Sequence, residues 1–275
     1  MKHWTLDDIA WDQYDPARVD PDILKVVKAA AMVERNAADY TAYLRNVFTD
    51  DAYFADMAEH WEAEEIQHGD ALGRWAEMAD PSFDYRDAFR RFREGYQIPI
   101  EVDASVRGSR TGELIARCIV ETGTSSFYSA LRDAADEPVL KEICHRIAGD
   151  EFRHYKMFYT HMQKYLERDN VPTWRRILVA ISRIRESEDD ELAMAYHCAN
   201  FDTAAPYDRR KSSLAYSARA FSLYRPTHVE RASNMVLKAA GIQPQGRFGR
   251  FFGSMMWRYV ANRSRRMTQE LQAAE

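Results

Sequence analysis

Two copies of one spacing pattern constrain this chain of 275 residues more than any other feature. A Glu-x-x-His sequence occurs at residues 65–68 and again at residues 151–154. Residues three apart lie on one face of an α-helix, so each pair offers a carboxylate and an imidazole to the same ligand. Glu34 lies 31 residues before the first pair, and Glu121 lies 30 residues before the second. This repeat predicts two helical hairpins packed about a pseudo-twofold axis.

Four glutamates and two histidines in this order are typical of four-helix proteins that hold two metal ions in the bundle core. Two divalent cations would balance the four carboxylates, which would otherwise be costly to bury. Carboxylate oxygens combined with imidazoles favour iron or manganese over a soft metal. The sequence therefore predicts a site for two Fe ions, with Mn as the alternative. The expected ligands are Glu34, Glu65, His68, Glu121, Glu151 and His154.

An acidic residue precedes the glutamate of each Glu-x-x-His pair, namely Glu64 in the first and Asp150 in the second. A metal-bound histidine usually donates its other N–H group to a carboxylate. We therefore expect Asp150 to orient His68 and Glu64 to orient His154, each across the paired helices.

Composition and periodicity predict an all-α protein, because Gly (11) and Pro (9) are sparse and strong helix formers are abundant. We expect an N-terminal arm at 1–20, a ferritin-like dimetal four-helix bundle at 21–168, and additional helices at 169–275 that pack on the bundle. The helices expected within the bundle region are 21–48, 52–79, 84–96, 113–134 and 138–168, with a connection at 99–112. The helices expected after it are 174–186, 189–201, 211–223, 227–240 and 248–272.

Several features bear on the compartment and on partners. No apolar stretch approaches the roughly 20 residues that span a bilayer, and the first residues lack the apolar segment of a secretory signal. The cysteines Cys118, Cys144 and Cys198 form no C-x-x-C pair, which argues against a rubredoxin-type site, a zinc knuckle or a disulfide framework. The formal charge of −5 gives no reason to expect a nucleic-acid partner. We therefore expect a cytoplasmic protein.

The segment Trp61–Asp70 (WEAEEIQHGD) resembles the soluble acyl-carrier-protein desaturases, which carry a similar Trp-x-Ala-Glu-Glu-x-x-His-Gly-Asp segment. Asp150–His154 resembles the Asp-Glu-x-x-His of that family, and Glu121–Thr124 resembles its Glu-x-x-Thr. Glu34 stands where the first ligand glutamate of the family is expected. The resemblance covers about residues 20–165.

This resemblance implies an oxygen-dependent di-iron oxidoreductase that desaturates an acyl chain bound to acyl carrier protein. Dioxygen would be the co-substrate, a ferredoxin-type protein the electron donor, and a homodimer the assembly. Thr124 would relay a proton beside the metals, or it would serve only as a small residue between helices. An apolar channel would hold the acyl chain. The candidates for its lining, which as residue types at helical spacing are more often plain core, are Met32, Phe127, Tyr128, Phe158 and Tyr159.

Other function classes remain open. A di-iron hydroxylase or oxygenase of another small substrate would use the same ligands, although Ile147 stands where the N-oxygenases of the superfamily carry an extra histidine. A non-enzymatic ferritin-like iron-binding protein would need only the bundle, so the hundred or so further residues argue against it. A scaffold protein would keep the fold without redox chemistry.

The region from Arg231 to Gln269 contains no Asp or Glu, and its arginines alternate with aromatic residues and methionines. One interpretation is a docking face for the strongly acidic acyl carrier protein. A second is peripheral contact of residues 247–266 with anionic lipid through a basic amphipathic helix. A third is a helix that packs its aromatic side on the bundle and leaves its arginines in solvent.

Overall fold

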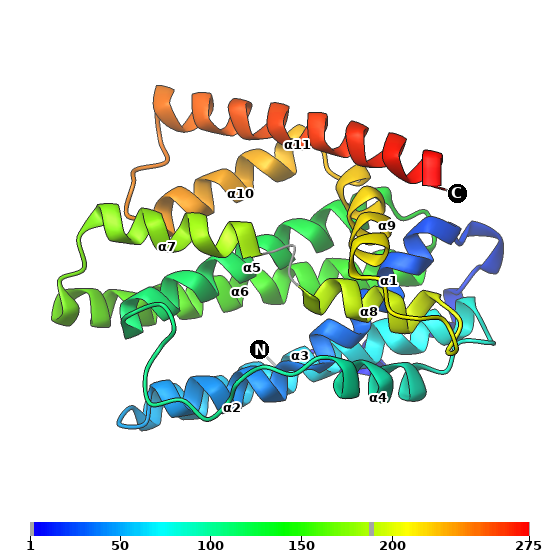
Figure 1. Cartoon of the computed structure of the whole chain (residues 1–275), viewed down its shortest axis with the longest axis horizontal. Helices are drawn as coiled ribbons and strands as arrows, with labels where there is room; N and C mark the ends of the chain where they lie inside the picture. Colours follow the sequence, from blue (N-terminus) through cyan, green and yellow to red (C-terminus); the bar gives the residue numbers. More distant parts are fainter. Residues whose placement is uncertain (1–2, 187–189, 275) are drawn as a thin grey trace.

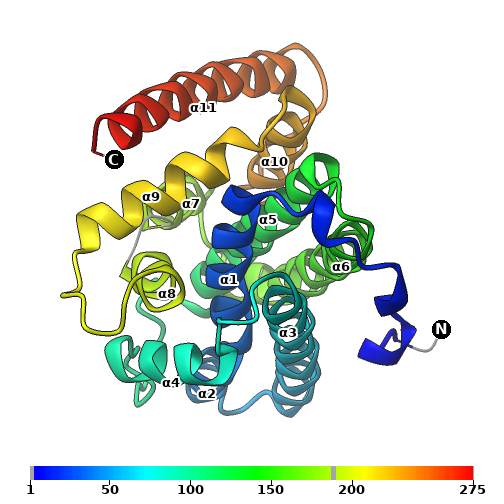
Figure 2. The same ribbon diagram turned by 90° about the vertical axis from the view of Figure 1, so that its right-hand side faces the viewer.

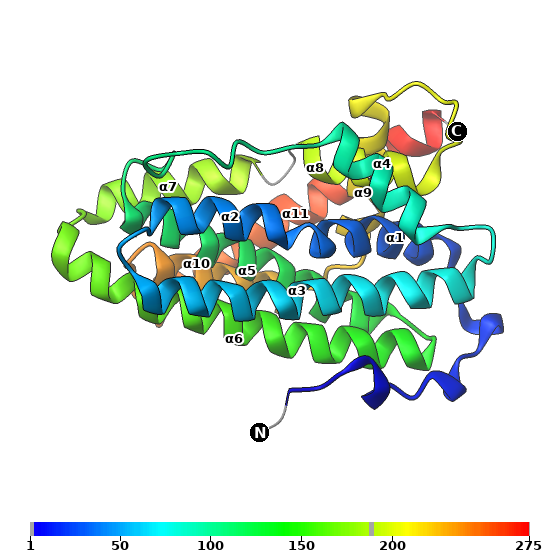
Figure 3. The same cartoon turned by 90° about the horizontal axis from the view of Figure 1, so that it is seen from below.

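The computed structural model describes residues 3–186 and 190–274, and this part of the chain is helical and contains no strand. The prediction of an all-α helical bundle is therefore confirmed. Four long helical segments run side by side (Figures 1 and 3). They are α1 (Pro21–Arg35) continued by α2 (Ala37–Val47), α3 (Ala52–Ala79), α5 (Arg110–Ala134) and α6 (Pro138–Asp169).

Side chains that accept backbone N–H groups fix where these helices begin. Asp20, Asp51, Ser109 and Glu137 each cap the first turn of one of the four segments. The Ser109 hydroxyl accepts from the backbone N–H of residue 112, so α5 begins at Arg110 rather than at the expected residue 113. The last residues of the expected connection are therefore helical.

The helix that we expected over residues 21–48 is interrupted at Asn36, so this prediction was wrong. The Asn36 side chain is fully buried and bonds to two other helices. Its Oδ1 accepts from Arg93 of α4 (Tyr85–Gly95) at 2.8 Å, and its Nδ2 donates to Glu191 of α8 (Asp190–Asn200) at 3.4 Å. These partners are distant in sequence and hold the side chain at the junction of α1 and α2.

Of the remaining helices, α7, α10 and α11 lie on one side of the four long segments, and α4 lies on another (Figures 1 and 2). Both α7 and α10 contact α5, α8 contacts α1, and α11 contacts α9 and α10. Their bounds agree with the expected ones within two residues, although residue 189, where we expected α8 to begin, lies outside the described residues. Among the described helices, none combines the length and apolar composition needed to cross a membrane. The helices not yet given are α7 (Thr173–Arg185), α9 (Arg209–Ser222), α10 (Pro226–Ala239) and α11 (Arg247–Ala274).

The expected N-terminal arm consists of short 3-10 turns at Leu6–Asp8, Trp11–Gln13 and Pro16–Arg18. It lies along the bundle near α3 and α6 (Figure 3). The arm is held there by polar contacts, because the Ala10 N–H donates to Glu142 of α6 and the Tyr14 hydroxyl donates to the Met78 carbonyl of α3.

The buried apolar residues form two clusters, one toward each end of the bundle. The first cluster includes Val27, Trp75 and Leu131, and the second includes Phe54 and Phe158. Each long helical segment contributes to both clusters, and between its two contributions it carries the predicted metal ligands. The bundle therefore consists of two apolar ends with a buried polar layer in the middle.

A close approach of α1 and α3 gives a test of this packing. A Cβ atom on Gly69 would lie 2.7 Å from the Ala31 carbonyl oxygen and 2.8 Å from the Arg35 Cβ. Gly69→Ala should lower the free energy of unfolding by about 1–3 kcal/mol, because the helices must separate to admit the methyl group. Gly149→Ala is the matched control, since a Cβ there meets nothing within 4 Å, and it should cause no loss. Equal unfolding midpoints in urea for the two variants would contradict this packing.

Candidate metal centre

All six predicted ligand side chains lie in the polar layer, and none is more than 6% exposed. Glu34 comes from α1, Glu121 from α5, and each Glu-x-x-His pair from one turn of α3 or α6. The helical spacing of three residues places the carboxylate and the imidazole of a pair on the same inward face.

Their ligand atoms form two groups, and within each group all atoms lie within 4.8 Å of one another. One group contains both residues of the pair on α3, and the other contains both residues of the pair on α6. Glu65 and Glu151 belong to both groups and could therefore bridge two ions, whereas Glu34 and Glu121 each belong to one. The groups are Glu34, Glu65, His68 and Glu151, and Glu65, Glu121, Glu151 and His154.

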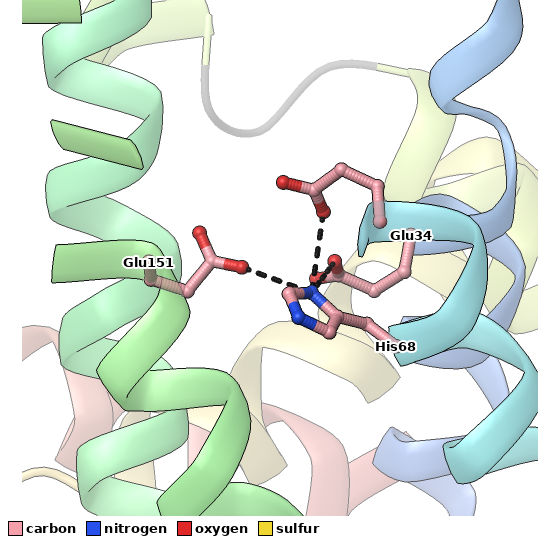
Figure 4. A group of neighbouring side chains, drawn as sticks. Glu34, His68 and Glu151 are labelled. Carbon is pink, nitrogen blue, oxygen red and sulfur yellow. Dashed lines mark ion pairs between the residues drawn. The ribbon is translucent and has the colours of Figure 1, made fainter. Parts of the chain in front are cut away.

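In the first group, His68 Nδ1 lies 3.5 Å from Glu34 Oε2, 3.6 Å from Glu65 Oε2 and 3.4 Å from Glu151 Oε1 (Figure 4). In the second group, His154 Nδ1 lies 3.1 Å from Glu65 Oε1 and 3.8 Å from Glu121 Oε2. The donor atoms thus surround two neighbouring positions, and the two imidazole rings lie 5.9 Å apart between centroids.

Several of these buried oxygen and nitrogen atoms have no hydrogen-bond partner, so they are available to bind a cation. A buried polar atom left without a partner costs about 1–3 kcal/mol. The cluster concentrates this cost in one small volume, and cations at the two positions would remove it. The donor set of carboxylate oxygens and imidazole nitrogens suits iron or manganese. The atoms concerned are Glu34 Oε2, His68 Nδ1, Glu121 Oε1, Glu151 Oε1 and His154 Nδ1.

Burial and mutual repulsion govern the protonation of the carboxylates. Burial, together with the charges of Glu151 and Glu34, raises the pKa of Glu65 to about 8. Burial and the charges of Glu151 and Glu65 also raise the pKa of Glu121 well above its ordinary value. In the metal-free chain the cluster therefore retains protons at neutral pH, and cations that bind must displace them.

Each histidine is fixed from outside the cluster by the acidic residue that we expected. His68 Nε2 lies 3.0 Å from Asp150 Oδ2, and His154 Nε2 lies 2.7 Å from Glu64 Oε2. These bonds leave the Nδ1 atom of each ring directed at the carboxylates. Burial lowers the pKa of His154, but the hydrogen bond with Glu64 and the nearby Glu65 carboxylate outweigh burial and raise this pKa to about 10. The outer carboxylates thus set the orientation of both imidazoles.

The N-terminal arm adds contacts that the sequence did not indicate. The Trp4 indole N–H donates to Asp150 Oδ2 at 2.7 Å, and its ring stacks on His68 with centroids 6.0 Å apart. His3 Nε2 lies 2.9 Å from the same Asp150 oxygen. Arg153, which stands inside the second Glu-x-x-His sequence, bonds to both Asp150 and Glu64. No periodicity links Trp4 to Asp150, which is 146 residues away.

Two hydroxyl groups of α5 contact the cluster. Thr124 Oγ1 donates to Glu151 Oε2 at 2.5 Å, and Tyr128 Oη donates to Glu34 Oε1 at 2.6 Å. Tyr128 was expected as a channel residue, and its hydroxyl contact with a predicted ligand was not. The other channel candidates divide between the two apolar clusters, with Met32 and Phe127 in the first, Phe158 in the second and Tyr159 packed against the second.

Residues 21–186 match the model of a fatty acid desaturase family, and this match covers well over half of the chain. The chain belongs to the fatty acid desaturase family. The match contains all six clustered Glu and His residues and the two acidic residues that orient the histidines, and it ends after α7. The comparison with curated proteins found no match. Membership supports an oxidoreductase that acts on fatty-acyl groups, and the buried clusters of the desaturase could hold metal ions.

Because two glutamates belong to both groups, the desaturase should lose metal unequally when single ligands are removed. Glu65→Ala should abolish binding of both ions, whereas Glu121→Ala should retain about one ion per chain. Glu62→Ala is the control, because Glu62 lies on the same helix and belongs to neither group. The number of bound metal ions per chain is measured by mass spectrometry of protein reloaded anaerobically with Fe2+. Glu65→Ala protein with the metal content of Glu62→Ala protein would show that the cluster is not the metal site.

Proposed function

We propose that this chain is an oxygen-dependent di-iron desaturase with a ferritin-like bundle that acts on an acyl chain bound to acyl carrier protein. The observation that supports this most is the pair of overlapping carboxylate–imidazole groups inside the segment that matches the desaturase family. Glu34 and Glu121 would each bind one iron, Glu65 and Glu151 would bridge, and His68 and His154 would complete the two positions. When bound, the iron pair would supply the activation of dioxygen.

The electron balance of this reaction calls for a second protein. Loss of two hydrogens from adjacent carbons releases two electrons, while reduction of dioxygen to two molecules of water consumes four. A one-electron carrier of the ferredoxin type would deliver the other two. We therefore propose this electron donor as one partner. Acyl carrier protein, which would present the substrate, is the second proposed partner, and a homodimer is the proposed assembly.

The residues of the chain have separate tasks in this proposal. Asp150 and Glu64 hold the histidines in one orientation, and the two apolar clusters exclude water from the polar layer. Thr124 is partly exposed, and its hydroxyl contacts the fully buried Glu151. Its hydroxyl would therefore pass a proton between Glu151 and the outer side of α5.

The absence of a histidine at residue 147 favours a desaturase over an N-oxygenase, because N-oxygenases of the superfamily carry an extra histidine at this position. Ile147 stands there, fully buried in the first apolar cluster, and adds no nitrogen ligand.

Replacing Thr124 by the isosteric valine tests the proton relay. Thr124→Val should keep the full metal content and slow dioxygen consumption by about 100-fold, which is the usual loss when one proton-transfer group is removed. Thr122→Val is the matched control, since the Thr122 hydroxyl is buried two residues earlier on α5 and donates to the Cys118 carbonyl at 2.7 Å. Equal dioxygen consumption by the two variants would assign Thr124 a packing role.

The direct test of the function uses iron-loaded protein with a ferredoxin reducing system, dioxygen and a saturated acyl chain on acyl carrier protein. Mass spectrometry of the released fatty acid should show a product that lacks two hydrogens. A product that has gained one oxygen would identify a hydroxylase instead. Iron oxidation without any change in the acyl chain would argue for an iron-binding role.

A further inference from the structure

Two helices outside the long bundle expose apolar side chains in regular rows. The α7 stripe consists of four residues spaced by four, three and three, and the α11 stripe of four residues spaced by three, four and four. Such spacings place the members of each row on one face of a helix. Every member is between 38% and 68% exposed, although each is a large apolar side chain. The α7 stripe is Trp174, Leu178, Ile181 and Ile184, and the α11 stripe is Phe248, Phe251, Met255 and Tyr259.

Both stripes face away from the rest of the protein. The opposite side of α11 packs on α9 and α10, where a Cβ on Gly253 would lie 3.5 Å from the Glu230 side chain. The side of α7 that contacts α5 and α10 includes Ala180, which is 2% exposed. Figures 1 and 2 show α7, α10 and α11 on the same side of the four long segments. Exposed apolar side chains that gather in rows mark interaction sites, whereas isolated exposed apolar residues are ordinary.

The sequence segments that carry these stripes contain basic residues and lack acidic ones. No Asp or Glu occurs at 170–185 or at 231–269, whereas the whole chain has a net charge of −5. Arg175 and Arg185 lie on the exposed surface of α7, and Arg247, Arg250 and Arg258 on that of α11. These three of the arginines in α11 have no acidic partner among the described residues. The exposed surface thus combines apolar side chains with positive charge that the chain itself does not neutralise.

We propose that the α7 and α11 stripes, with the arginines beside them, dock the protein on an anionic lipid surface. Aromatic and aliphatic side chains on one face of a helix, flanked by arginine, are typical of helices that lie in the plane of a membrane interface. Trp174 and Tyr259 are residue types enriched at the boundary between acyl chains and headgroups. The proposal concerns peripheral contact and does not depend on the metal centre.

Lipid fits this surface better than the other two kinds of occupant. A second copy that used the same faces would place arginine opposite arginine, because the faces contain no acidic residue to meet them. An acidic protein would match the arginines, but it would also have to present apolar grooves to two separate rows of side chains. A fluid bilayer accommodates both rows without shape complementarity and supplies the anionic charge.

Sedimentation with vesicles tests the proposal on the full chain. The protein should bind vesicles rich in phosphatidylglycerol, bind phosphatidylcholine vesicles weakly, and lose affinity at high salt because salt screens surface charge. Phe251→Ser combined with Met255→Ser should weaken binding at least about tenfold, since two apolar anchors are removed. Tyr53→Ser is the matched control, because Tyr53 is 66% exposed on α3 and lies outside both stripes.

A second double variant replaces two exposed arginines, whose removal should not affect folding. Arg250→Gln combined with Arg258→Gln should weaken binding and reduce its salt dependence, while metal content and circular dichroism remain unchanged. Three results would overturn the proposal: no binding to phosphatidylglycerol vesicles, equal binding by the Phe251/Met255 variant and the Tyr53 control, or a dimer in light scattering that the Phe251/Met255 variant alone dissociates. Metal content is measured on the same samples, so loss of vesicle binding can be told apart from failure of the proposed di-iron function.

Discussion

Burial of four carboxylates and two imidazoles between two apolar clusters is the constraint on which the rest of the structure depends. Ionised carboxylates are costly to remove from water, so this layer requires protons, hydrogen bonds or cations to compensate their charge. The long helical segments are arranged around this requirement. Each one contributes apolar side chains to both ends of the bundle and places one or two polar side chains between them. The apolar ends supply the stability that the polar layer lacks.

The contacts around the cluster explain how its geometry can be held before any cation binds. Asp150 receives hydrogen bonds from His68, Trp4 and Arg153, so one carboxylate connects two long helices and the N-terminal arm. Tyr128 of α5 donates a hydrogen bond to Glu34 of α1. Side chains fixed in this way lose less conformational entropy when they bind a ligand, which favours a preorganised site. The arm lies outside the segment that matches the desaturase family, and it contributes the Trp4 contact with Asp150 to the site.

Local sequence patterns were sufficient for some of these features and not for others. The repeated spacing led to all six clustered side chains, because helical periodicity alone places Glu65 beside His68 and Glu151 beside His154. The same spacing could not show which glutamates are shared by the two groups, since sharing depends on how the helices are rotated in the bundle. The break at Asn36 and the contact of Trp4 with Asp150 depend on partners far away in the sequence, which no local pattern encodes.

The most direct test of the dimetal centre is the stoichiometry and magnetic coupling of bound Mn2+, measured by titration and electron paramagnetic resonance on the full chain. If Glu65 and Glu151 bridge two positions, the protein should bind about two ions per chain, and their spins should be exchange-coupled, as expected for ions about 3.5–4 Å apart. Binding of a single ion, or of ions with the uncoupled spectrum of isolated Mn2+, would contradict a bridged pair in the polar layer.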